Sequence, residues 1–433
     1  MPRSTRQSEL VLVIGFLTLI AGVPVTQTGL ELVRHERVQC TDVFRYRPSA
    51  QNLRQYEHTL EEKSWLQREL RPVMQRLLFA TLRDTGAKGV LGRDRWLFYR
   101  PDLRYLVDPD RLEGDARESR WAQPSGSGTH RESVIRAMVR FHDQLQERGI
   151  ALVVVPVPGK PSVYPDQVTR REVGRQPPLQ SPTRELLSAL QRQGVATVDL
   201  FATFGEARSE AGQGQTKGAL YLAQDTHWTP RGAELAAEAV AAQLRERKLA
   251  PAQTMAFRTE RVVVTRWGDV LDMMQIPGLR DVFPPETVEC HQVRDPVLGP
   301  LVPTASGRPG TYRYPGQKAS VLVLGDSFCR IYQSPEPRSL GELPDATGRT
   351  GEWGAKRLLP GSAGFIAHLA LALQSPVDAI VSDGGASADV RRKLSTDPEI
   401  LEGKKVVVWV FVERDIALGR QGWEDVPLPA KLD

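Results

Sequence analysis

The sequence has few of the residue patterns that would identify its chemistry directly. Its 433 residues include only three cysteines, Cys40, Cys290 and Cys329, and none of them is in C-x-x-C spacing, so they indicate no zinc site. The chain contains no internal repeat and no low-complexity tract. Its formal net charge is +5, from 57 basic and 52 acidic residues. This excess is too small for a chain of this length to predict nucleic-acid binding, so we expect no nucleic-acid partner.

Charged residues are absent from one stretch near the N-terminus. No residue from Leu10 to Leu30 is charged, and the stretch is long enough to cross a hydrocarbon core of roughly 30 Å. Arg3 and Arg6 precede it, which favours a cytoplasmic N-terminus and export of the remainder. We therefore expect a transmembrane signal anchor over residues 1–31. A cleaved signal peptide is the alternative, although the small-x-small pattern of a cleavage site is poor here.

The segment after the anchor is polar and has a helical pattern. Residues 32–87 are expected to form a helical membrane-proximal segment, because apolar residues recur in it at mostly helical spacing, at Leu53, Tyr56, Leu60, Leu66, Leu70 and Val73. With either an anchor or a signal peptide, most of the chain would work outside the cytoplasm. Cys40 and Cys290 could form a disulfide there.

From residue 88 onward, short apolar runs alternate with amphipathic helical patterns. We expect strands over 151–157, 195–201, 320–327, 377–382 and 404–412, and helices over 131–149, 181–194, 230–248, 364–374 and 387–394. Continuous apolar strands between amphipathic helices are typical of an α/β fold with a mostly parallel sheet and helices on both faces. We expect this fold over residues 88–433. A stretch rich in proline and glycine, around 276–317, is expected to form an excursion from this α/β core, as a hairpin or a cap.

The run "VLVLGDSFCR", Val321 to Arg330, has the pattern of a nucleophile at the end of a buried strand. The strand would end at Leu324, and the glycine that follows allows a tight turn. Ser327 would then stand at the edge of the sheet where ligands of such folds bind, near backbone N–H groups that can stabilise an oxyanion. The alternative is that Asp326 or Ser327 only caps a helix.

The stretch "AQDTHWTPRG", Ala223 to Gly232, offers the base that such a serine needs. If this loop is extended, Asp225 and His227 project to the same side, so the carboxylate can hold the imidazole N–H. A helix is expected to begin cleanly after them, with Thr229 as its N-cap and Pro230 at its first position.

Three other interpretations of Asp225 and His227 remain open at this level. Both can be plain turn residues, and the histidine can be a core residue with its hydrogen bonds satisfied. A metal site would need a third ligand, but the other histidines stand singly, without ligand spacing, at His35, His58, His130, His142, His291 and His368. We therefore predict no metal.

"DTHW" upstream of "GDSF" resembles the alginate O-acetyltransferase family of AlgJ and AlgX. The catalytic domain of that family is similar to SGNH hydrolases but carries its Asp-x-His before the serine. Further stretches match in sequence order, at Val90–Tyr99, Val154–Asp166, Trp267–Met274 and Val407–Asp415. The resemblance covers most of the chain after the anchor, and the anchor suits the AlgJ type. No separate carbohydrate-binding module of the AlgX kind is evident after the last expected strand.

Two details depart from the family pattern. Arg95 stands where the family usually has glycine before Trp-Leu-Phe. No Asn block of the hydrolase kind follows a strand, and the nearest equivalent is "SDGG", Ser382 to Gly385. The oxyanion donors beyond the backbone of Ser327 are therefore not defined by the resemblance.

The resemblance implies a reaction and a role for each residue of the triad. Ser327 would carry an acetyl group, His227 would act as general base and then acid, and Asp225 would orient the histidine. The acceptor would be a polysaccharide hydroxyl. No cofactor is implied, because a multispanning membrane O-acyltransferase would supply the acetyl group to a catalytic domain held at the inner membrane, in the periplasm. An acetyl esterase with the same triad and a non-catalytic polysaccharide-binding scaffold are the alternatives.

Candidate substrate contacts lie at strand ends or just beyond them. They are Lys160, Arg330, Tyr332, Gly361 and Arg414. An ordinary surface role is the alternative for the four side chains, and a simple turn for the glycine. His368 lies within an apolar helical pattern and is expected to be structural.

Overall fold

The computed structural model describes most of the chain in two compact units. The described residues are 3–44, 64–107, 130–174, 181–211, 218–253, 255–300, 310–314, 318–334, 361–418 and 422–429, with 47, 49, 52–54, 56–57 and 59. One unit comprises Met1–Thr85 with Gln275–Gly278, and the other comprises Gly86–Met274 with Leu279–Asp433.

The first unit is helical. Its elements are α1 (Arg3–Val33), η1 (Gln39–Phe44) and α3 (Trp65–Leu82). Within α1, the 23 residues Val11–Val33 have a mean hydropathy of 1.9 and are long and apolar enough to cross a membrane. Their large apolar side chains are exposed in the chain by itself, as a bilayer-facing helix requires. This helix is consistent with the expected single-pass anchor.

A six-stranded sheet forms the centre of the second unit. Its strand order is β4-β3-β11-β9-β10-β8, and all neighbouring strands are parallel except β8, which runs antiparallel at the edge. The strands are β3 (Ala151–Val157), β4 (Ala196–Thr197), β8 (Thr311–Tyr312), β9 (Val321–Gly325), β10 (Val377–Val381) and β11 (Val406–Val412). The central strands are apolar throughout because helices cover both faces.

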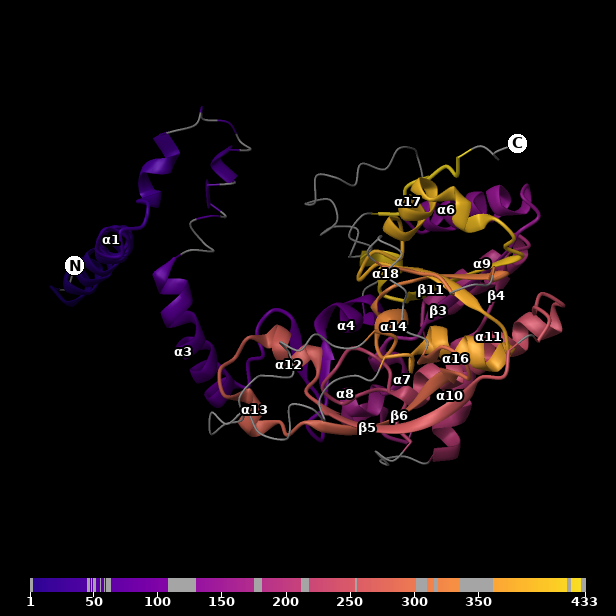
Figure 1. The fold of residues 1–433 in the computed structure, drawn as a ribbon. Helices are drawn as coiled ribbons and strands as arrows, with labels where there is room; N and C mark the ends of the chain where they lie inside the picture. The colour runs from indigo at the N-terminus through magenta and orange to yellow at the C-terminus, as the bar shows by residue number, and fades with distance from the viewer. Residues whose placement is uncertain are drawn as a thin grey trace. The chain divides into compact units, whose positions relative to one another are not determined.

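Helices lie on both faces of the sheet (Figure 1), and alternating side chains of its strands pack into two separate hydrophobic clusters. One layer comprises α10 (Leu200–Ala211), α11 (Pro230–Glu246) and α16 (Phe365–Leu373). The other comprises α6 (His130–Gln146), α9 (Thr183–Arg192), α17 (Asp389–Thr396) and α18 (Asp415–Leu418). The prediction of a mostly parallel sheet with helices on both faces is confirmed.

Shorter elements surround the end of the sheet where the strands finish. They are β1 (Gly89–Leu91), β2 (Leu97–Tyr99), α4 (Arg100–Val107), α7 (Lys160–Val163), α8 (Pro165–Val168), η2 (Arg170–Glu172) and α14 (Ser327–Arg330), whereas η3 (Pro398–Leu401) lies before the start of β11. β1 and β2 form an antiparallel hairpin. Because β3, β9, β10 and β11 are parallel, the residues that follow them meet at one edge.

The excursion from the parallel sheet is larger than expected. β5 (Arg258–Arg266), β6 (Glu286–Asp295) and β7 (Gly299–Pro300) form an antiparallel sheet, with α12 (Asp269–Met274) and α13 (Leu279–Val282) between β5 and β6. The expected hairpin is present, but it begins at Arg258 and not near residue 276. The sequence analysis did not predict β5, because four of its first five residues are exposed and three of those are charged, so its apolar run is limited to Val262–Val264.

One other expectation was wrong. The strand expected over 195–201 is reduced to Ala196–Thr197, because the Asp199 carboxylate accepts hydrogen bonds from the N–H groups of Phe201 and Ala202 and so starts α10 early. Cys290 and Cys329 are buried free thiols of the second unit, and Cys40 is a free thiol of the first.

Candidate functional site

Ser327, His227 and Asp225 meet at the edge where the parallel strands end. The Ser327 Oγ lies 2.8 Å from Nε2 of His227, and Nδ1 of the same ring lies 2.6 Å from Oδ1 of Asp225. About a hundred positions separate the serine from the other two residues, so the fold creates the contact. A carboxylate on Nδ1 favours the tautomer with a proton there, which leaves Nε2 free to accept the serine proton.

The turn after β9 presents Ser327. Asp326 caps α14, with Oδ1 accepting from the Phe328 N–H at 2.9 Å, while Oδ2 accepts from the Val412 N–H at 2.8 Å. The buried aspartate therefore ties the serine turn to the end of β11. A side chain at Gly325 would overlap Cys329, so this tight turn requires a glycine. The capping role that was the alternative interpretation of Asp326 is present, and it coexists with a half-buried Ser327.

The loop that carries Asp225 and His227 is bent, and the expectation of an extended segment was wrong. Asp225 Oδ1 accepts hydrogen bonds from both the backbone N–H of His227, at 3.0 Å, and its ring Nδ1. This side-chain turn brings the carboxylate to the ring without a β-strand. Thr229 then caps α11 by accepting from the Gly232 N–H, and Pro230 begins the helix, as predicted.

Asp225 is held in its ionised form. It is fully buried, and its Oδ2 accepts from Arg266 at 2.6 Å and from the Asp269 N–H at 3.1 Å. Burial alone would raise the pKa of Asp225, but the charges of Arg266 and His227 hold that pKa well below its usual range. Burial lowers the pKa of His227, but the Asp225 carboxylate and the Asp269 charge together outweigh burial, so the pKa of His227 is raised.

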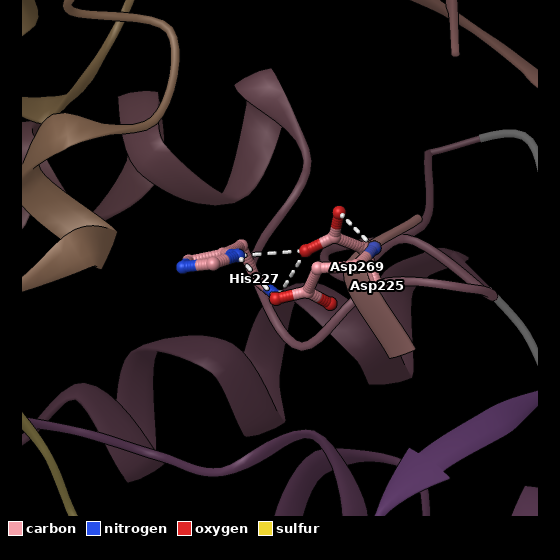
Figure 2. A group of neighbouring side chains, drawn as sticks. All are labelled: Asp225, His227 and Asp269. Carbon is pink, nitrogen blue, oxygen red and sulfur yellow. Dashed lines mark hydrogen bonds and ion pairs between the residues drawn. The ribbon is translucent and has the colours of Figure 1, made fainter. Parts of the chain in front are cut away.

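A second carboxylate faces the same ring. Asp269 Oδ2 lies 3.4 Å from His227 Nδ1, and the two aspartates flank the histidine (Figure 2). Sequence reasoning missed Asp269 as well as Arg266. The only signal was the stretch "WGDVLDMM", which begins one residue after Arg266 and matches the family without indicating a role.

Asp225, His227 and Asp269 are close enough to one another to hold a cation, since one ligand atom from each lies within 4.8 Å of the others. The sequence argument against a metal did not foresee this third ligand. Each of these atoms already has a protein partner, however, including the Arg266 guanidinium on Asp225. We therefore explain the cluster by its hydrogen bonds and assign no metal to it.

Lys160 lies beneath the loop and does not face a polysaccharide, so that expectation was wrong. Its side chain is 1% exposed. Nζ donates to three backbone carbonyls of the loop, those of Leu222, Ala223 and Asp225, at 3.0, 3.0 and 2.7 Å. The Ala223 carbonyl also accepts from the Leu97 N–H at 2.8 Å, and the three acceptors together hold the buried ammonium group. Lys160 therefore supports the segment that carries the base.

Glu286 also holds the loop, through hydrogen bonds to its backbone N–H groups. Its carboxylate accepts from the N–H groups of Ala223 and Gln224 at 2.8 and 2.9 Å. Glu286 begins β6 and Arg266 ends β5. The antiparallel sheet thus supplies both residues, and its role here is to position the base.

Tyr332 and Gly361 also lie inside the protein. Tyr332 is fully buried, and its hydroxyl donates to the Trp228 carbonyl at 3.1 Å, so the expected substrate contact is wrong. Gly361 is buried at φ +71°, and its carbonyl accepts from Gln292 at 3.1 Å, which fits the turn role that we considered for it.

Arg330 is exposed near the serine, whereas Arg414 is mostly buried there. Arg330 has 45% of its side chain exposed and pairs with Asp383 at 2.7 Å. Arg414 follows β11, pairs with the buried Asp102 at 2.8 Å, and lies 5.9 Å from the Phe328 ring centroid with 14% of its side chain exposed. His368, in contrast, is structural as expected: it is buried and contacts the His291 carbonyl at 2.9 Å, and burial lowers its pKa to about 4.

The fold and this site define a class of proteins. Residues 90–333 match the family model described as the SGNH hydrolase-like domain of acetyltransferase AlgX, and the chain belongs to that family. The resemblance seen in the sequence is thereby confirmed.

Named relatives are AlgJ proteins. The chain is 30% identical over 258 residues to the probable alginate O-acetylase AlgJ of Pseudomonas aeruginosa, a match that covers 57% of this chain and 57% of that protein. It is 26% identical over 337 residues to the Pseudomonas putida protein of the same name, covering 76% and 71%. The solved O-acetyltransferase domain of Pseudomonas putida AlgJ shares the fold, with a TM-score of 0.53 at 22% identity, over 77% of this chain and 93% of that one.

Proposed function

We propose that the protein is an extracytoplasmic O-acetyltransferase that moves acetyl groups onto polysaccharide hydroxyls through an acetyl-serine intermediate. The observation that carries this proposal is the hydrogen-bonded series from Ser327 Oγ through the His227 ring to Asp225, in a chain of an acetyltransferase family. A serine with a base and an orienting carboxylate is the arrangement that nucleophilic acyl transfer needs.

The reaction would proceed in two balanced halves. In the first, His227 Nε2 takes the proton of Ser327 while Oγ bonds to the acetyl carbonyl carbon, and the donor oxygen leaves with that proton. In the second, an acceptor hydroxyl gives its proton to His227 and attacks the acetyl carbon, and Ser327 leaves and recovers a proton. Asp225 keeps the ring oriented and stabilises the imidazolium formed in each half.

The acceptor is an acidic polysaccharide in this proposal. The relatives are named probable alginate O-acetylases, and Arg330 offers an exposed guanidinium group that could pair with sugar carboxylates. The acetyl donor would come through a multispanning membrane O-acyltransferase, without a bound cofactor. The apolar helix α1 would hold the enzyme at the inner membrane beside this partner, with the catalytic unit in the periplasm.

Acceptor competition tests the proposal against its esterase alternative. The detergent-solubilised full chain is given a chromogenic acetyl ester, with and without unacetylated alginate oligosaccharides, and free acetate and acetylated sugar are both measured by mass spectrometry. A transferase diverts acetyl from water to sugar. If the sugar gains no acetyl and the acetate yield does not change, the esterase assignment replaces ours. If Ser327→Ala leaves polymer acetylation in cells unchanged, the protein acts as a scaffold.

A further inference from the structure

Asp269 has an unusual position for a residue outside a Ser-His-Asp series. It begins α12, and its side chain reaches back to the loop that holds the base. Oδ1 accepts from the Thr226 N–H at 2.7 Å, and Oδ2 accepts from the Thr226 hydroxyl at 2.6 Å. The same Oδ2 lies 3.4 Å from His227 Nδ1. Asp269 therefore holds the residue between Asp225 and His227 by both its backbone and its side chain.

The Thr226 hydroxyl connects the two carboxylates to the ring. Because it donates its proton to Asp269, its oxygen can accept from His227 Nδ1, which lies 3.1 Å away. Three acceptors therefore lie near the Nδ1 proton. The Asp225 oxygen at 2.6 Å and the Asp269 carboxylate both face Nδ1 (Figure 2), and the Thr226 oxygen is the third. All three acceptors favour the same tautomer.

The charges of the cluster explain why one carboxylate is insufficient. Arg266 forms a buried ion pair with Asp225 at 2.6 Å, and this pair has no net charge. Asp225 and Arg266 alone would therefore give the imidazolium of the reaction little net stabilisation. Asp269 adds the missing negative charge, so that the cluster with a protonated His227 is neutral.

We propose that Asp269 is a positioning residue that restores, beside His227, the negative charge that Arg266 cancels on Asp225. The inference rests on the proposed function only where it treats His227 as the catalytic base. In each half of the reaction, the proton that His227 takes on Nε2 would be stabilised from the Nδ1 side by Asp225 and Asp269 together. The bond to Nδ1 stays with Asp225, and Asp269 takes no proton from the substrate.

Several charged groups face the cluster from the surrounding elements. They are Lys160 of α7, Arg266 at the end of β5, Glu286 of β6, Asp326 before α14 and Arg414 after β11. The Asp269 side chain is 31% exposed, so water reaches its carboxylate. Burial of the rest of the group and the Asp225 charge raise the pKa of Asp269 to about 6. Asp269 is therefore ionised near neutral pH and loses its charge in mild acid.

The test measures the basicity of His227 in full-length variants. Asp269→Asn keeps an acceptor for the Thr226 N–H and removes the charge, Asp269→Glu keeps the charge, and Asp272→Asn is the matched control. Asp272 lies on the same helix, is half exposed and pairs with Arg280 at 2.9 Å. Acetyl-ester hydrolysis is followed from about pH 5 to about pH 9, and the pKa of the acidic limb of kcat/KM is read for each variant.

We expect Asp269→Asn to move the acidic limb down by about one pH unit, because an imidazolium that loses a nearby negative charge releases its proton more readily. Asp269→Glu should return the limb toward its wild-type position, and Asp272→Asn should not move it. A limb that stays at the wild-type pH in Asp269→Asn, whatever the rate, overturns the proposal and leaves Asp269 as a loop support only.

A second measurement does not depend on activity. The His227 ring is titrated by NMR in the Ser327→Ala background, with its signal assigned by His227→Gln, and the titration is repeated after adding Asp269→Asn. A lower pKa of His227 supports the proposal even if acetyl transfer is never observed, and an unchanged pKa rejects it. Failure of the proposed function would appear separately, as Ser327→Ala that retains ester hydrolysis or polymer acetylation.

Discussion

At the residue scale, the distances between three side chains lead to a prediction about the intermediate. Ser327→Ala removes the only oxygen that can carry the acetyl group in the proposed mechanism, so no acetyl-enzyme should form. Asp225→Asn should retain the fold and slow acetyl transfer by up to about 10⁴-fold, because the amide favours the wrong histidine tautomer. Intact-protein mass spectrometry after mixing with an acetyl ester detects the intermediate. Acetylation of Ser327→Ala at the wild-type rate would show that another residue is the nucleophile.

The pH dependence of the wild-type protein follows from the same contacts. Only neutral His227 can act as a base, so activity should rise as the ring loses its proton. Burial lowers the pKa of His227, but the Asp225 carboxylate and the Asp269 charge together outweigh burial and raise this pKa above the ordinary 6.5. A raised pKa keeps the ring protonated to higher pH, so the acidic limb of kcat/KM should lie above pH 6.5. A limb below that value would contradict this assignment of the base.

Lys160 gives a prediction about stability. Lys160→Met keeps the length of the side chain but removes the Nζ donor from three loop carbonyls, of which, among the described residues, only that of Ala223 keeps the Leu97 N–H as a partner. We expect the free energy of unfolding to fall by about 2 kcal/mol or more. Activity should also fall in the protein that remains folded, because the loop carries the base. Thermal and denaturant unfolding measure the first effect. Lys318→Met is the control, since Lys318 pairs with Glu402 at the exposed surface; equal effects in the two variants would argue against a buried support role.

At the element scale, the connection from β5 to α12 has to approach the catalytic loop closely. A Cβ at Gly268 would overlap the backbone of Gln224 and lie 2.5 Å from the Asp225 nitrogen. Backbone atoms cannot move aside cheaply, so Gly268→Ala should displace Asp225 and reduce activity on the order of 100-fold. Gly29→Ala, where no atom lies within 4 Å of the added group, should leave activity unchanged. Normal activity of Gly268→Ala would show that the loop is not held at this contact.

The elements also differ in how well their sequence predicts them. β3, β9 and β11 are continuous apolar runs, and their burial on both faces is visible in the sequence. β5 has mostly exposed and often charged residues, so its strand structure depends on pairing with β6 through the register from Arg258↔Arg294 to Arg266↔Glu286. Pairing between segments this far apart leaves little local pattern, which is why the excursion was placed too late in the chain.

At the scale of the whole molecule, the apolar helix α1 leads to a prediction about location. The full chain should stay in the membrane fraction after a high-salt wash and be released by detergent, with its bulk digested by protease added from the periplasmic side. Leu17→Arg places a charge within the span at a cost of roughly 3 kcal/mol and should reduce retention. N-terminal sequencing of the mature protein distinguishes the alternatives. A soluble mature form that begins after the span would identify a cleaved signal peptide.

The sequence by itself determined the class of fold and the three members of the proposed triad, because each depends on local order along the chain. An apolar strand before Gly-Asp-Ser predicts a nucleophile, and an Asp-x-His before a capped helix predicts its base. Both motifs can be recognised from neighbouring residues, without knowing the tertiary structure. Only the tertiary structure decided that Lys160 and Tyr332 point inward, and that Arg266, Asp269 and Glu286 surround the base. These polar groups are at most partly exposed because partners from distant segments satisfy their hydrogen bonds and charges, and no periodicity along the chain records which partners those will be.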